Sequence, residues 1–407
     1  MENGRGRNLT SLKIGNRAQI LNVLKNTGPI SRVDISKKLH LTPAAITIIV
    51  NEMLKEGIVV EAGPLEEKDK RSGRKKVLLD ISRVYKNIIG INIESDIVNI
   101  CVSNTKGEVL VYKRINTDKS LSPKDFLKYI SNVCMNLLWN KNILKENIIG
   151  VGVGMVGPVE KSKGVSIHAY GLWKNEVPVK EILEEYLGLR VVVDNNVRTL
   201  ALGEIDYHSE EEMSNVLFLK YGPGIGASVI INNELYTGSG YSAGEIGHTI
   251  VECRGDICRC GRRGCLETTS SYSAIIKDTK IIFGKEITPE LYKLCGEDSI
   301  NLNIAYILEA ANLGDILVED ILKNAIFKLS IAISNAAKLY DPKTVIIYGE
   351  AFNNPLFISN LKTFMSELMV EKNVEDFMFL SKLNYKSNYI GAVALALREF
   401  FYNTGGM

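Results

Sequence analysis

The stretch AGEIGHTIVECRGDICRCGRRGCLE, residues 243–267, carries the most specific signal in the chain. It holds four of the seven cysteines and one of the four histidines in a protein of 407 residues. A Cys/His cluster of this kind suits a metal site, a redox centre or a zinc finger that reads DNA. The cluster alone does not choose among the three, so the choice depends on the sequence around it.

Composition is that of an ordinary globular protein, with 45% hydrophobic and 24% charged residues. The length corresponds to two or three domains. We find no apolar run of about 18 residues that could cross a bilayer. The N-terminus MENGRGRNLT also lacks the apolar core of a secretory signal. We therefore expect a cytoplasmic protein, with the scattered Cys101, Cys134 and Cys295 buried as small hydrophobic residues.

Charge is unevenly distributed along the chain. The net charge is +2, but residues 1–80 carry fifteen Lys or Arg against nine Asp or Glu, a net of +6. The remainder therefore carries a net of −4. A basic head on a mildly acidic body indicates that the head contacts a polyanion.

The head shows the order of elements of a winged helix-turn-helix. A helix from Asn16 should end at Gly28-Pro29, and a second should start after Ser31 as its N-cap. A third should start at Thr42-Pro43 and end at Gly57, and two strands around the charged tip KRSGRKK should form a wing. Small residues at the start of the third helix would allow close approach to base edges, and the wing would bind phosphates. The candidate DNA-binding residues are Ser31, Arg32, Thr42, Ala44, Ala45, Thr47, Arg71 and Arg74.

From Tyr85 the pattern changes to strands alternating with helices, which predicts an α/β architecture. Three strands precede an amphipathic helix near 123–139 and the buried strand IIGVGVGM. Later strands are expected at LRVVVDNN, VLFLKYG, GASVIINNELY and TVIIYG, with a final helix at YIGAVALALREFF.

The motifs of this body resemble those of the ROK family of repressors and sugar kinases. The motifs GVGMVGPVE, VVVDNNVRTLALGE, GPGIGAS, AGEIGH and CRCGRRGCLE occur in the family's order and spacing over about residues 85–400. The resemblance implies two actin/hexokinase-like lobes with a sugar cleft between them. We expect a winged helix over 1–82, a first lobe over 83–200 and 387–407, and a second lobe with a zinc site over 201–386.

This context favours a metal site for the cluster. His248, Cys258, Cys260 and Cys265 form a closed set of one imidazole and three thiolates, which suits structural zinc, and the family places zinc there. Cys253 lies outside the pattern. The absence of a C-x-x-C pair disfavours redox chemistry, and no second Cys/His pair completes a zinc finger. By resemblance, the sugar-binding residues are Asn195, Asn196, Glu245, His248 and Glu267.

Two features that the family's kinases require are missing. The kinases' D-x-G-G-T phosphate loop corresponds to Asn92–Asp96, which has no glycine and two carboxylates. The catalytic Asp of their E-N-D motif corresponds to Asn196, eight residues before Glu204, and an amide cannot accept the proton of a sugar hydroxyl. Asp194 supplies a carboxylate two residues earlier, where we expect a different orientation.

The sequence thus predicts a sugar-responsive transcriptional repressor that binds operator DNA as a homodimer or a dimer of dimers. A sugar kinase is the alternative from another class, and an activator stays open within the DNA-binding class. The Asp-Asn-Asn variation resembles the xylose repressors of low-GC bacteria, so xylose is the first candidate effector, and glucose and N-acetylglucosamine remain alternatives.

Overall fold

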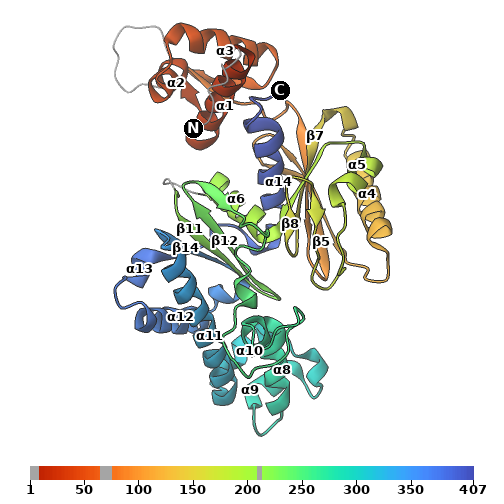
Figure 1. Ribbon diagram of the computed structural model, residues 1–407, viewed down its shortest axis with the longest axis vertical. Coiled ribbons are helices and arrows are strands. Elements are labelled where there is room, and N and C mark those ends of the chain that lie inside the picture. Colours follow the sequence, from red (N-terminus) through yellow and green to blue (C-terminus); the bar gives the residue numbers. More distant parts are fainter. Residues whose placement is uncertain (1–8, 65–75, 209–212) are drawn as a thin grey trace. The chain divides into compact units, whose positions relative to one another are not determined.

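The computed structural model describes residues 9–64, 76–208 and 213–407. The chain divides into two units (Figure 1). The first comprises residues Met1–Tyr207 and Asn388–Met407, and the second comprises His208–Ser387. The last twenty residues thus belong to the same unit as the N-terminal helices.

The N-terminal head is a winged helix-turn-helix. Three helices alternate with a small antiparallel sheet in the strand order β1-β3-β2. The elements are α1 (Leu9–Thr27), β1 (Ile30–Ser31), α2 (Arg32–Leu39), α3 (Pro43–Lys55), β2 (Val59–Pro64) and β3 (Val77–Ile81). Strands β2 and β3 are the predicted strands of the wing, and the residues between them, 65–75, lie outside the described part of the chain.

Local capping explains where these helices begin. The Ser31 hydroxyl accepts a hydrogen bond from the Asp34 amide, and the Thr42 hydroxyl accepts one from the Ala45 amide. Pro43 occupies the first turn of α3, where its missing N–H costs no hydrogen bond. Helix α1 begins at Leu9, earlier than the predicted start at Asn16, and it includes Gly15, which costs about 1 kcal/mol in a helix but does not end this one.

The rest of the first unit is a five-stranded mixed sheet in the order β10-β7-β4-β5-β6. Its strands are β4 (Asn87–Ile93), β5 (Ile97–Asn104), β6 (Val109–Asn116), β7 (Ile148–Met155) and β10 (Val191–Asn195). Helices α4 (Pro123–Asn140) and α5 (Val179–Leu187) cover one face, and α14 (Ile390–Leu397) covers the other (Figure 1). Helix α6 (Asn196–His208) follows β10, and a two-stranded ribbon pairs β8 (Val159–Glu160) with β9 (Val165–Ser166).

Glycines let α14 approach the sheet closely. A Cβ on Gly152 of β7 would lie 2.0 Å from the Ala392 carbonyl oxygen, and a Cβ on Gly90 of β4 would lie 2.6 Å from Val393. Both contacts are too short for any larger residue. The opposite face of the same strands carries Ile91 and Val153, which pack in the core beneath α4 and α5. In IIGVGVGM, Gly152 therefore faces α14, and the larger residues on either side of it face α4 and α5.

A buried ion cluster joins the head to the rest of the first unit. Asp206, near the end of α6, has a side chain only 1% exposed. Its carboxylate accepts hydrogen bonds from Lys25 of α1 at 2.5 Å and from Arg398 at 2.6 and 2.7 Å. Nearby in the fold, Arg17 of α1 is also buried and donates to the Gly405 carbonyl at 2.8 Å and to Glu56 at 2.9 Å.

The second unit is a mixed sheet in the order β13-β12-β11-β14-β15 with helices packed on it. The strands are β11 (Val216–Tyr221), β12 (Ile225–Ile231), β13 (Glu234–Tyr236), β14 (Thr344–Tyr348) and β15 (Met378–Leu380). The helices are α7 (Glu267–Ser270), α8 (Tyr272–Ile282), α9 (Pro289–Cys295), α10 (Ile304–Asn312), α11 (Ile316–Tyr340), α12 (Pro355–Leu368) and α13 (Val374–Phe377). The loop from β13 to α7 carries the Cys/His cluster.

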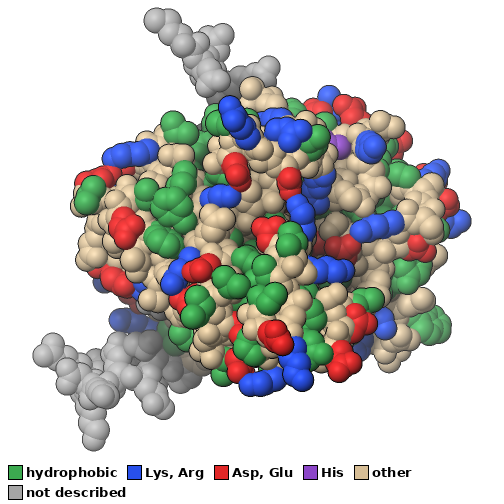
Figure 2. All heavy atoms as spheres, turned by 90° about the horizontal axis from the view of Figure 1, so that it is seen from below, with side chains coloured by type: hydrophobic (Ala, Val, Ile, Leu, Met, Phe, Trp, Pro, Cys, Tyr) green, Lys and Arg blue, Asp and Glu red, His purple; other side chains and the backbone are tan. Residues whose placement is uncertain are grey.

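In the described part of the chain, no helix is long and apolar enough to span a membrane. On the face shown in Figure 2, basic and acidic side chains are interspersed with small hydrophobic areas. This mixture agrees with the near-zero net charge, +2, of the whole chain.

Candidate functional site

The recognition helix α3 has one buried and one exposed face. Ile46, Ile49, Val50 and Met53 are buried, as the sequence predicts. On the other side lie Ala44, Thr47, Ile48 and Asn51, which are exposed. Thr47 and Ile48 each lie three or four residues from both Ala44 and Asn51. Sequence reasoning missed Ile48, although it lies off the buried stripe on a helical wheel. It is 63% exposed.

The other predicted DNA-binding residues differ in their placement. Ser31 is buried and caps α2, and its hydroxyl donates to the Asp34 carboxylate. Thr42 caps α3, and the Thr47 hydroxyl donates to the Pro43 carbonyl at 2.7 Å, so its methyl group is the side-chain group free for outside contacts. Arg32 contacts Asn51 and Glu61. Arg71 and Arg74 lie outside the described residues.

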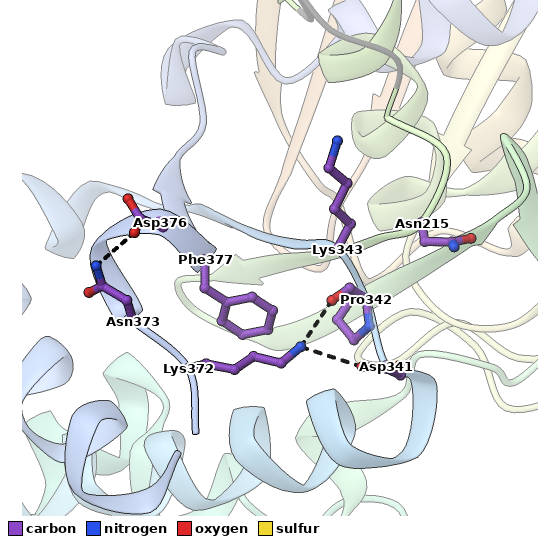
Figure 3. A pocket seen from close by; sticks show the side chains of 8 residues that line it. All are labelled: Asn215, Asp341, Pro342, Lys343, Lys372, Asn373, Asp376 and Phe377. Carbon is purple, nitrogen blue, oxygen red and sulfur yellow. Dashed lines mark hydrogen bonds and ion pairs between the residues drawn. The ribbon is translucent and has the colours of Figure 1, made fainter. Parts of the chain in front are cut away.

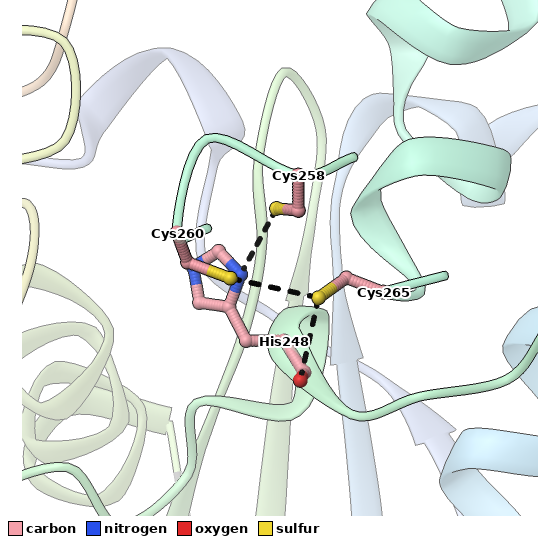
Figure 4. A group of neighbouring side chains, drawn as sticks. All are labelled: His248, Cys258, Cys260 and Cys265. Carbon is pink, nitrogen blue, oxygen red and sulfur yellow. Dashed lines mark hydrogen bonds between the residues drawn. The ribbon is translucent and has the colours of Figure 1, made fainter. Parts of the chain in front are cut away.

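The four predicted metal ligands converge in the second unit. His248, Cys258, Cys260 and Cys265 each offer one ligand atom, and these atoms lie within 4.8 Å of one another. Figure 4 shows the three thiols gathered around the His248 ring. Short turns position them: His248 closes a 3-10 turn, and the Gly261 amide donates to the Cys258 carbonyl at 2.9 Å to fold the loop back.

The distances within the cluster suit a tetrahedral ion. The Cys258 sulfur lies 3.5 Å from His248 Nδ1, and the Cys260 and Cys265 sulfurs are 3.6 Å apart. Zinc–sulfur bonds of about 2.3 Å place tetrahedral thiolates roughly 3.8 Å apart. Burial raises the pKa of the Cys265 thiol to about 12, and a bound cation would offset this by stabilising the thiolate. The residues present therefore fit a closed metal site.

The remaining cysteines differ from this group. Cys101, Cys134 and Cys295 are buried, as predicted, and burial raises the pKa of the Cys134 thiol to about 12, which makes it a poor nucleophile. Cys253 is exposed and does not belong to the cluster.

Two predicted sugar-binding carboxylates lie close to the metal cluster. His248 directs Nδ1 toward the thiols, and its other nitrogen, Nε2, lies 3.8 Å from the Glu245 carboxylate. Glu267 begins α7 directly after the loop, and its Oε1 accepts hydrogen bonds from the Ile225 amide at 3.1 Å and from Arg259 at 3.0 Å. One imidazole can therefore contact a metal and polar groups on opposite sides.

Asn195 and Asn196 lie in the first unit, at the junction of β10 and α6. The Asn195 side chain accepts from the Val197 and Arg198 amides and donates to the Gly157 carbonyl, which satisfies its oxygen and leaves one N–H for a ligand. Asn196 is 3% exposed, and among the described residues its side-chain amide has no hydrogen-bond partner. Neither amide atom is fully buried, so this unpaired amide can donate to and accept from a ligand.

The preceding carboxylate does not substitute for the missing base. Asp194 is buried, and its Oδ1 accepts a hydrogen bond from Arg198 Nε at 2.7 Å. Strand β10 ends at Asn195 and helix α6 begins at Asn196, so the alternation of side chains along a strand does not relate Asp194 to Asn196. The Asp194 carboxylate is thus neutralised by an arginine within the fold.

In the loop Asn92–Asp96, which corresponds to the kinases' phosphate loop, the acidic side chains are paired with groups of the first unit. The Glu94 carboxylate accepts hydrogen bonds from Asn92 at 3.1 Å and from Asn388 at 3.0 Å. Asp96 is exposed and pairs with Lys119 at 2.6 Å. Only Glu94, rather than both acids, is directed into the unit, but a carboxylate in this position repels a phosphate group.

A shallow pocket of about 450 Å³ lies elsewhere in the second unit (Figure 3). Lys372 crosses it, stacks on Phe377 at 4.3 Å, and contacts Asp341 and the Pro342 carbonyl, both at 3.4 Å. Its two lysines and two aspartates balance, and none of the predicted site residues lines it. The pocket therefore presents no net charge to a ligand.

Two family models match the chain. The model of the ROK family matches residues 88–399, and a winged helix-turn-helix DNA-binding model matches residues 16–60. The xylose repressor of Caldicellulosiruptor bescii is 29% identical over 96% of this chain and 98% of its own length. The xylose repressor of Bacillus subtilis is 25% identical, covering 95% and 96% of the two chains. The Escherichia coli regulator NagC is 24% identical, covering 96% and 94%.

Solved structures support the same fold. A ROK family transcriptional regulator, a homologue of the Escherichia coli MLC protein, has a TM-score of 0.80 at 24% identity and covers 97% of both chains. A ROK family glucokinase from Streptomyces griseus has a TM-score of 0.67 at 23% identity and covers 76% of this chain and 98% of its own. The part of this chain that the glucokinase does not cover is of the size of the winged head. With the family model spanning most of its length, this chain belongs to the ROK family.

Proposed function

We propose that this protein is a sugar-responsive transcriptional repressor that binds operator DNA through its winged helix. The observation that carries the proposal is the union of a DNA-binding head and a ROK body in one chain, over the full length shared with curated repressors. The sugar is proposed to be an aldose. Xylose is the first candidate, because two of the relatives named above are xylose repressors. N-acetylglucosamine is an alternative, since the N-acetylglucosamine repressor of Escherichia coli is 24% identical to this chain.

A sugar kinase is the competing function, and the site disfavours it. Asn196 replaces the catalytic Asp of the family's kinases, and its amide cannot take a proton from a hydroxyl. Glu94 occupies the position where the kinases use glycine to approach a phosphate. Both losses affect phosphoryl transfer and leave hydrogen bonding to a sugar intact. The protein is therefore proposed to bind sugar without phosphorylating it.

For sugar recognition we propose contacts from Asn195 and Asn196 in the first unit and from Glu245, His248 and Glu267 in the second. Structural zinc is proposed for His248, Cys258, Cys260 and Cys265, because three thiolates and one imidazole form a closed tetrahedral set that favours this ion. Zinc would supply no chemistry beyond holding the loop. We further propose a cytoplasmic homodimer or dimer of dimers, since repressors of this kind bind two half-sites.

For DNA recognition we propose that the exposed stripe of α3, Ala44, Thr47, Ile48 and Asn51, together with Ala45 and Arg32, enters the major groove. Ser31 and Thr42 would act by capping the helices that present this stripe. Arg71 and Arg74 in the wing are proposed to bind phosphates. A β-branched apolar side chain such as Ile48 suits the methyl group of thymine.

Ile48→Ala is expected to weaken operator binding only where thymine methyl groups are present. Uracil in place of the contacted thymine removes one methyl group, worth about 0.8 kcal/mol or roughly fourfold in affinity. The wild-type protein should bind the uracil operator more weakly than the thymine operator by this factor. Ile48→Ala should bind the two operators with equal affinity. Fluorescence anisotropy on an operator selected from random DNA measures both.

The matched control is Leu12→Ala, which truncates another exposed hydrophobic residue of the head, on α1. It should keep the full sensitivity to uracil. If Ile48→Ala and the wild-type protein respond identically to uracil at every thymine of the half-site, Ile48 does not contact a thymine methyl.

Asn196→Ala is expected to weaken sugar binding by about five- to a hundredfold, because a hydroxyl or its partner loses a buried hydrogen bond. Calorimetric titration with D-xylose, D-glucose and N-acetylglucosamine measures the affinity, and operator release measures the response. Asn136→Ala, at an exposed position of α4, is the control and should leave both unchanged. Sugar-dependent ADP production from ATP by the wild-type protein would contradict the proposed function and favour the kinase.

A further inference from the structure

Glu267 is held in one orientation by groups outside its own helix. Two donors, the Ile225 amide and the Arg259 guanidinium, converge on the same oxygen, Oε1. The stem of the side chain also runs close to the backbone, since a Cβ on Gly247 would lie 3.0 Å from Glu267 Cγ. The side chain is 10% exposed and cannot rotate without losing these contacts.

The second carboxylate oxygen is left for an outside donor. Over the described residues, no hydrogen bond to Glu267 Oε2 is formed, and this oxygen is not among the fully buried atoms. A carboxylate that is ionised only accepts hydrogen bonds, so Oε2 is matched to the O–H of a ligand.

The backbone position of Arg259 is set by the loop over residues 248–265, which carries the four clustered ligands. Arg259 lies between Cys258 and Cys260, two of the four clustered ligands. The backbone on either side is tied by hydrogen bonds from the Cys258 amide to the Arg262 carbonyl at 2.7 Å and from Gly261 to Cys258. The same turn that brings the thiols together therefore also places the Arg259 guanidinium beside Glu267.

We propose that Arg259 is a positioning residue for sugar recognition, which holds Glu267 so that Oε2 accepts a hydrogen bond from a sugar hydroxyl. The inference rests on the proposed sugar site and adds a residue to it. Arg259 is 42% exposed, and an ion pair this open to solvent contributes little to folding stability. Its effect is therefore on the affinity for sugar and not on the stability of the unit.

The test is a double-mutant cycle with Arg259→Ala, Glu267→Gln and the double variant, using whichever of D-xylose, D-glucose and N-acetylglucosamine binds the wild-type protein most tightly. Arg259→Ala should raise the dissociation constant about tenfold, as expected for loss of a charge-assisted hydrogen bond. Arg259→Lys should recover part of the loss. In the Glu267→Gln background, Arg259→Ala should have little further effect.

Arg254→Ala is the matched control, because it removes the same charge from an exposed position of the same loop. It should leave sugar affinity unchanged. Arg259→Ala should keep the metal content and the melting temperature of the wild-type protein, measured by mass spectrometry of the metal and by calorimetry. Loss of metal in Arg259→Ala would make its role structural and overturn the inference.

The outcomes separate the inference from the function on which it rests. If Glu267→Gln weakens sugar binding and Arg259→Ala does not, or if the two effects simply multiply, Arg259 does not position Glu267 and the sugar site stands. If Glu267→Gln leaves the affinity for all three sugars unchanged, the proposed sugar site fails, and the inference fails with it.

Discussion

Cys260→Ser is expected to abolish metal binding and, with it, the response to sugar. The wild-type protein should contain about one zinc ion per chain, bound by the four clustered ligands. A ligand present at a thousand times its dissociation constant stabilises a fold by about 4 kcal/mol, so losing the ion should lower the free energy of unfolding of the second unit by at least that amount. Metal analysis and denaturant unfolding measure the two effects.

Cys253→Ser provides the control for this variant. Cys253 lies in the same loop but is exposed and outside the cluster, so its replacement should leave metal content, stability and sugar response unchanged. A folded, sugar-responsive protein with a metal content near zero would refute the metal site.

Asp206→Asn is expected to lower the free energy of unfolding by about 3–5 kcal/mol, because it leaves two partly buried cations without a counter-charge. Lys25 and Arg398 both depend on this carboxylate, and burial already lowers the pKa of Lys25 despite its partner. Chemical denaturation measures the change. Asp320→Asn, at an exposed position of α11, should alter stability by less than about 0.5 kcal/mol.

Lys25→Met distinguishes the ion cluster from ordinary packing. It removes one of two cations and leaves Asp206 paired with Arg398. Its cost should be well below that of Asp206→Asn. Equal losses in the two variants would show that the charge balance of the cluster is not what stabilises the fold.

Features that depend on neighbouring residues were predictable from the sequence. The caps at Ser31 and Thr42 and the stop at Gly28 lie where the structure has them, because each is a contact within a few residues. The four clustered ligands lie within eighteen residues, and their convergence follows from the tight turns at Gly261 and Gly264. Short-range geometry of this kind can be read from residue types.

Contacts across the chain were not predictable in this way. Asp206 meets residues 181 and 192 positions away, and Arg17 bonds a carbonyl 388 positions away. A single sequence does not indicate which buried acid pairs with which base. The pairing of Arg259 with Glu267 spans only eight residues, but it depends on how the metal loop turns, which residue types do not specify.

Helix α6 has a mechanical consequence for signalling. Its first residue is Asn196, and near its last turn Asp206 forms an ion pair with Lys25 of the DNA-binding head. Thirteen residues of α-helix form a strut about 20 Å long that resists stretching and bending. A small rigid-body shift at the Asn196 end would therefore reach α1 through Asp206 and Lys25, with no unfolding or loop rearrangement along the helix.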